Sequence, residues 1–105
     1  MTHPTKDQFS GCLIGQCLGD ALGFPVEGYP PEVCGRYVEE FLKSWRAGEI
    51  GREPFAFGQY TDDSQLAREL LQSYAAVGDF EPADYAHRLA AIFAEGRIVG
   101  RGRAT

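Results

Sequence analysis

An apolar segment with glycine at every fourth position most constrains how this chain can fold. Residues 9–22 are apolar on nearly every side, which predicts a buried helix. Glycine recurs at Gly11, Gly15, Gly19 and Gly23, and this spacing places all four near one stripe of a helix. Because each interior glycine costs about 1 kcal/mol relative to alanine, the stripe predicts close packing of another backbone against it. Pro25 disfavours helix at the residue before it and ends the segment.

Three further segments have the apolar periodicity of helices, and they cover 32–47, 61–77 and 82–95. The helix over 32–47 is expected to present one apolar side, made by Val33, Tyr37, Val38, Phe41, Leu42 and Trp45. Residues 48–60 are rich in glycine and proline, and the short alternation at Phe55 and Phe57 has no partner strand, so a loop is expected there. The sequence therefore predicts an all-α fold, a partial helical bundle of about four helices.

Composition excludes several classes of protein. The 105 residues carry a formal charge of −5, which disfavours non-specific binding to nucleic acid because that binding needs a surplus of Lys and Arg. The polar N-terminus lacks the basic start of a signal peptide, and no apolar run approaches the roughly 18–20 residues of a membrane span. The three cysteines form neither a disulfide framework nor a zinc motif and are most simply small core residues. A reducing compartment, and hence the cytoplasm, is expected.

The sequence Thr61-Asp62-Asp63 at the start of a predicted helix has two interpretations. Thr is a good N-cap, and acidic residues in the first turn are favoured by the helix dipole. However, one carboxylate would satisfy the dipole, and a hydroxyl with two carboxylates makes three hard oxygen ligands of the kind that Mg²⁺ or Mn²⁺ prefers. Consecutive side chains diverge by about 100° around a helix, so they address two ions more easily than they chelate one.

Two other acidic residues are candidates for a polar site. Asp20 lies late in an apolar helix, where it either bonds a neighbouring helix end, reaches solvent, or supports a polar site from behind. Glu27 follows Pro25 in a bend between glycines, which can present a side chain at the lip of a cleft, although a loop glutamate is more often a solvated charge. His87, with no second histidine except His3 near the N-terminus, is expected to be a non-ligating residue.

These motifs together resemble the ADP-ribosylglycohydrolase family. The resemblance is carried by GCLIGQCLGDALGFPVEG at 11–28, YTDDSQLARELL at 60–71 and GRGRAT at 100–105, in the family's order. It implies an all-α fold with a pair of Mg²⁺ or Mn²⁺ ions at helix ends, which acts on ADP-ribose or ADP-ribosylated protein. The C-terminal loop is more similar to the RGYG-type loop of some branches than to the aspartate-bearing loop of the arginine-directed bacterial branch, which disfavours an arginine-linked substrate.

The resemblance also assigns expected roles to individual residues. Thr61, Asp62 and Asp63 match the N-terminal metal ligands, and Glu27 matches the glutamate that serves some members as acid/base group. Asp20 is expected behind the site, and Gly100 and Gly102 belong to a substrate-lining loop.

The chain is expected to be a fragment, residues 1–105 forming the N-terminal third of one domain. The family's second acidic motif, D-x-D-[ST], supplies further metal ligands and is absent from this sequence. Two functions therefore remain open: part of a metal-dependent hydrolase of ADP-ribosyl glycosidic bonds, or an inactive structural fragment. The fragment would self-associate or bind a complementing C-terminal piece.

Overall fold

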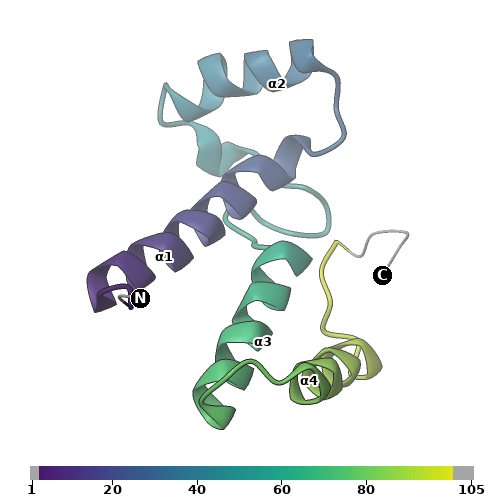
Figure 1. Cartoon of the computed structure of the whole chain (residues 1–105). Helices are drawn as coiled ribbons and strands as arrows, with labels where there is room; N and C mark the ends of the chain where they lie inside the picture. Colours follow the sequence, from purple (N-terminus) through teal and green to yellow (C-terminus); the bar gives the residue numbers. More distant parts are fainter. Residues whose placement is uncertain (1–2, 101–105) are drawn as a thin grey trace. The chain divides into compact units, whose positions relative to one another are not determined.

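The computed structural model describes residues 3–100 and is helical, with no strand in that range beyond an isolated bridge in the loop after Arg52. Two compact units divide the chain between Tyr60 and Thr61. The first unit holds α1 (Lys6–Gly23) and α2 (Pro31–Tyr37) with three short helical turns, and the second holds α3 (Asp62–Val77) and α4 (Pro82–Ala94) (Figure 1). The predicted all-α class with four helices is confirmed. None of the helices in the described range is long and apolar enough to cross a bilayer.

Helix α1 begins earlier than its apolar periodicity predicts because of a capping box at its N-terminus. The Gln8 amide donates to Thr5 Oγ1 at 3.1 Å, and the Thr5 amide donates to Gln8 Oε1 at 2.9 Å. This reciprocal pair satisfies two N–H groups that the first turn would otherwise leave unpaired. The helix ends just before Pro25, as the sequence predicts, and is succeeded by a 3₁₀ turn, η1 (Phe24–Val26).

The predicted backbone packing on the glycine stripe is not present in the described part of the chain. A Cβ atom placed on Gly11, Gly15, Gly19 or Gly23 would have no atom within 4 Å. None of the residues of α1 is buried, and Phe9, Ile14 and Leu18 are about half exposed. The expectation of a buried helix is therefore wrong for α1 as the structure describes it.

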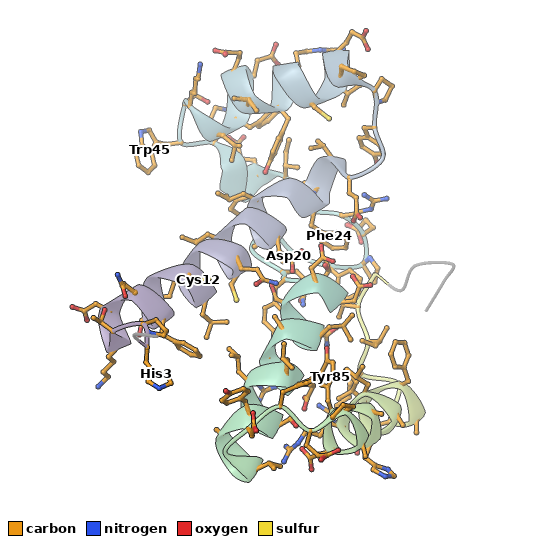
Figure 2. The ribbon with its side chains drawn as sticks, in the orientation of Figure 1. His3, Cys12, Asp20, Phe24, Trp45 and Tyr85 are labelled. Atoms are coloured by element: carbon orange, nitrogen blue, oxygen red, sulfur yellow. The ribbon has the colours of Figure 1, made fainter. Side chains whose placement is uncertain are left out.

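The predicted helix over 32–47 is interrupted by a wider turn. Helix α2 stops at Tyr37 and continues as a π-helical turn, η2 (Val38–Leu42). Here the Lys43 amide bonds the Val38 carbonyl and the Arg46 amide bonds the Phe41 carbonyl, five residues back in each case. The helical segment ends at Leu42, and Trp45 follows it in a turn with a left-handed φ of 63°. Trp45, expected on the apolar side of the predicted helix, is instead 95% exposed and projects from the ribbon (Figure 2).

The second unit consists of two helices, α3 and α4, joined by a short turn. Helix α3 ends at Gly78, whose φ of 88° is the left-handed conformation that glycine adopts without strain. Ile92 of α4 is 2% exposed and forms the centre of the small core. The Tyr85 hydroxyl on α4 donates to the Leu66 carbonyl on α3 at 3.1 Å, and the Ser73 hydroxyl donates to Asp84 Oδ2 at 2.6 Å.

The Asp84 carboxylate makes the stability of this unit depend on pH. The hydrogen bond from Ser73, and then the bond from Arg88, hold the pKa of Asp84 below its usual value. A carboxyl group whose pKa is lowered by folding contributes stability above its unfolded pKa of about 3.9 and loses it as pH falls through the folded pKa. We expect the urea midpoint of Asp84→Asn to lie below wild type at pH 7 and to converge with it as the pH falls through the lowered pKa of the folded Asp84 carboxyl. An equal difference above and below that pKa would contradict this account.

Candidate active site

Thr61 occupies the N-cap position of α3, but its side chain makes no capping hydrogen bond. Its backbone is extended, with φ −118° and ψ −163°, and the residue is only 3% exposed. A threonine whose role was to cap would accept a bond from an amide of the first turn. Capping therefore does not account for the Thr61 hydroxyl, although the position itself is the one predicted.

Asp62 and Asp63 form the first turn of α3, as the sequence predicted, and differ in exposure. Asp62 is half-buried and Asp63 is exposed, which fits two consecutive side chains that leave the helix in different directions. Their position places negative charge beside the positive end of the helix dipole. Among residues 3–100 no three His, Cys, Asp or Glu side chains converge as a metal site would require. The hydroxyl and the two carboxylates fit part of an oxygen-ligand set and leave the rest of the coordination to other donors.

The segment after α4 is bound directly to the start of α3. The Asp62 amide donates to the Val99 carbonyl at 2.7 Å, and the Gln65 side chain spans the same gap. Its Nε2 donates to the Arg97 carbonyl at 2.7 Å, and its Oε1 accepts from the Val99 amide at 2.9 Å. Gly100, with φ 71°, follows Val99 directly and therefore lies next to the N-terminus of α3, which carries the two aspartates. Gly102 lies outside the described residues.

Glu27 follows the 3₁₀ turn η1 in the first unit and is exposed. Its φ of −57° and ψ of 126° turn the chain out of the helix, and Gly28, with φ 81°, completes the bend. Asp20 lies in the same unit, half-buried in the last turn of α1, where its carbonyl accepts the Phe24 amide (Figure 2). Thus Asp20 and Glu27 belong to one unit, and Thr61, Asp62, Asp63 and Gly100 belong to the other.

Other side chains fix the end of α1 from which the Glu27 turn starts. The Tyr37 hydroxyl donates to the Leu22 carbonyl at 2.7 Å, and Tyr37 is 4% exposed. Burial raises the pKa of this phenol, so it stays a neutral donor at physiological pH. The Cys34 thiol lies 3.7 Å from the Val26 carbonyl and 3.6 Å from the Tyr29 carbonyl.

Two interpretations of other residues are corrected. The cysteines were predicted to be small core residues, but Cys12 is exposed and Cys17 and Cys34 are only partly buried. Two of them lie on α1, which has no buried residue. The tyrosines were also predicted to be core residues, but Tyr29, Tyr60 and Tyr74 are 43–50% exposed, whereas Tyr37 is buried. His87 is exposed on α4.

Sequence reasoning missed the polar residues that line α3. Gln65 joins the helix to the segment ending at Gly100, and Ser64, Glu69 and Ser73 are all at most 7% exposed. A cluster of buried polar residues on a helix with apolar neighbours is unusual. The signal that could have found three of them is spacing, because positions 65, 69 and 73 lie along one face of a helix, whereas Ser64 lies off that face.

Comparison with known proteins identifies the family. The ADP-ribosylglycohydrolase family matches residues 1–105. The chain is 36% identical over 86 residues to human ADP-ribosylhydrolase ARH3 and 31% identical over 99 residues to the ADP-ribosylarginine hydrolase Tri1 of Pseudomonas putida. It is also 33% identical over 93 residues to an uncharacterised protein of Archaeoglobus fulgidus. These alignments cover 79%, 92% and 86% of this chain, respectively. No solved structure matches the chain.

The chain belongs to the ADP-ribosylglycohydrolase family. The same alignments cover 23%, 24% and 28% of the three relatives, so the chain spans about a quarter of their length. The resemblance carried by the sequence motifs is thereby confirmed at the level of the family.

Proposed function

We propose that this chain provides the glutamate and the N-terminal metal ligands of a cytoplasmic, metal-dependent hydrolase. The enzyme would cleave the glycosidic bond between ADP-ribose and a protein side chain or small leaving group. The observation that carries the proposal is the start of α3, where a buried threonine precedes two carboxylates in a chain of this family. Three free cysteines fit a reducing compartment.

Each group has a distinct role in this chemistry. Thr61, Asp62 and Asp63 would hold Mg²⁺ or Mn²⁺ ions together with ligands from elsewhere in the complete protein; such ions orient the ribose hydroxyls and the attacking water. Glu27 donates a proton to the leaving group or accepts one from the water, as carboxyl groups do in glycoside hydrolysis. The Val99–Gly100 backbone, bound to the Asp62 amide, forms a wall beside the ribose. Asp20 supports the polar site from behind the Glu27 turn.

The proposal leaves open which linkage to ADP-ribose is cleaved. An assay that compares two ADP-ribosylated substrates tests this. The names of two relatives point to ADP-ribosylated substrates, and one of them specifies arginine. Because the loop from Gly100 to Thr105 contains no aspartate, we expect the complete protein to hydrolyse hydroxyl-linked ADP-ribose faster than arginine-linked ADP-ribose. Chelation of divalent ions should abolish both activities, and added Mg²⁺ or Mn²⁺ should restore them. Hydrolysis unaffected by the chelator, or none with either substrate, would contradict the proposal.

A second candidate function, an inactive self-associating fragment, is favoured by the surface of α1. Phe9, Ile14, Leu18 and Leu22 on that helix are 38–58% exposed, and exposed apolar groups of this kind often mark an interface. Sedimentation velocity of this chain, which measures its oligomeric state, together with the hydrolysis assay of the complete protein, distinguishes the two candidate functions. A concentration-dependent oligomer without metal-dependent hydrolysis in the complete protein would favour the second.

A further inference from the structure

Arg52 lies in the loop between the first unit's helices and α3, and its side chain reaches back 25 residues to the Glu27 turn. One guanidinium nitrogen, Nη1, donates to the Phe24 carbonyl at 3.1 Å and to the Glu27 carbonyl at 2.8 Å. These two carbonyls belong to the first residue of η1 and to the residue immediately after it. A single cation therefore links both ends of the turn that carries Glu27.

The guanidinium also lies over two aromatic rings. Its central carbon lies 5.4 Å from the centre of the Phe24 ring and 5.5 Å from the centre of the Tyr29 ring. At these distances a cation is attracted by the ring face. Phe24 and Tyr29 flank Glu27 in sequence, so the same side chain contacts the turn on both sides of the glutamate through its rings as well as its carbonyls.

The backbone around Arg52 is fixed independently of its side chain. Arg52 and Phe55 exchange two backbone hydrogen bonds, at 3.1 and 2.7 Å, and the Phe55 ring packs on Phe24 with centroids 5.9 Å apart. Gly51 permits this geometry, because a Cβ atom there would lie 2.6 Å from the Phe55 carbonyl oxygen. Arg52 therefore lies in a hydrogen-bonded turn, residues 52–55, which also contacts the start of η1 through the Phe55 ring.

We propose that Arg52 is a positioning residue, which clamps the turn from Phe24 to Tyr29 and so fixes the placement of the Glu27 carboxylate. This inference rests on the proposed function of Glu27 as acid/base group. Charge-assisted bonds to two carbonyls are stronger than neutral ones, and they restrain a turn whose own backbone bonds are few. The Glu27 side chain stays exposed to meet substrate, while its backbone is held.

The first test measures motion of the Glu27 turn in the full 105-residue chain. We expect Arg52→Met, which keeps a long stem without donors, to lower the ¹⁵N heteronuclear NOE at Glu27 and Gly28. The NOE values of α1 and α2, which belong to the same unit as the turn, should stay unchanged, which shows that this unit remains folded. Arg52→Lys retains donors but not the planar group, so it should give an intermediate loss. Arg36→Met, an exposed arginine on α2, is the matched control and should leave the turn unchanged.

Gly51→Ala provides a second route to the same result. It leaves the Arg52 side chain intact but displaces the bridge to Phe55, so the NOE at Glu27 should fall as it does in Arg52→Met. Unchanged NOE values at Glu27 in both variants would overturn the proposal.

The second test measures catalysis in the complete protein. Misplacement of a reacting group by about 1 Å can cost roughly 100-fold in rate. Arg52→Met should therefore lower kcat by roughly 10- to 100-fold with little change in KM, and Arg52→Lys should recover part of the loss. Unchanged kcat in Arg52→Met would overturn the positioning role. If the wild-type protein hydrolyses no ADP-ribosyl bond, the proposed function fails, whereas the NMR result still decides whether Arg52 holds the turn.

Discussion

Replacing Glu27 by glutamine is expected to lower kcat for ADP-ribosyl hydrolysis by about 100- to 10,000-fold, the contribution that general acid–base groups usually make. Glutamine has nearly the shape of glutamate but neither donates nor accepts the proton that the reaction transfers. The Glu27 side chain is exposed, and Arg52 bonds its backbone carbonyl rather than its carboxylate. The substitution should therefore leave the fold intact. Substrate binding should be preserved, so KM should change far less than kcat.

The matched control for this experiment is Glu32→Gln. Glu32 is an exposed glutamate in the first turn of α2, five residues further along the same unit. The two variants change the net charge equally, so a difference in kcat between them is due to the specific place of Glu27 and not to the loss of one negative charge. A Glu27→Gln enzyme that retains full kcat, or a Glu32→Gln enzyme that loses as much, would contradict the assignment of Glu27 as acid/base group.

The helices were predictable where local signals agree. Helix α1 ends just before Pro25 as predicted, although Phe24 keeps a helical backbone, with φ −56° and ψ −42°, and enters a 3₁₀ turn. Gly78 ends α3 with the left-handed φ that glycine permits, and Thr61 precedes α3 as its N-cap residue. Glycine and proline between 48 and 60 correctly indicated a loop. These features depend on residues close together in the sequence, so no tertiary information was needed to find them.

The errors concern what each helix packs against. The apolar character of residues 9–22 predicted burial, but α1 has no buried residue, because burial requires a packing partner and the apolar pattern of one helix does not specify one. The π turn after Tyr37 and the end of the helical segment at Leu42 were also unpredictable from periodicity, so Trp45 lies in a turn and is exposed instead of lying on the expected helix face. Neither property is encoded in the spacing of apolar residues alone.

The residues of the candidate site were identified from sequence motifs, but the contacts that hold them in place were not. Thr61, Asp62, Asp63 and Glu27 were identified from residue type and position. The contacts of Gln65 with residues 97–99 and of Arg52 with the Glu27 turn join positions 25 to 34 residues apart. Glutamine and arginine in those places have no distinctive local pattern, so only the structure reveals them.

The second large effect is expected at the start of α3. Removal of both carboxylates by Asp62→Ala/Asp63→Ala should abolish saturable Mn²⁺ binding, because carboxylate oxygens supply the charge that holds a hard cation. If the two aspartates served only the helix dipole, their loss would weaken the helix by a few tenths to about 1 kcal/mol each without changing specific metal affinity. The Thr61 hydroxyl, which makes no capping bond, argues against capping as the whole explanation of this sequence.

The measurement that tests the central claim most directly is a Mn²⁺ titration of this chain followed by EPR, with three proteins compared. They are the wild type, Asp62→Ala/Asp63→Ala, and Glu39→Ala/Glu40→Ala, which removes an adjacent exposed acidic pair from η2 and so changes the net charge equally. The account predicts saturable binding in the wild type and in the Glu39/Glu40 variant, and its loss in the Asp62/Asp63 variant. Equal weak binding in all three would mean that the aspartates of α3 hold no metal in this chain, and would contradict the account.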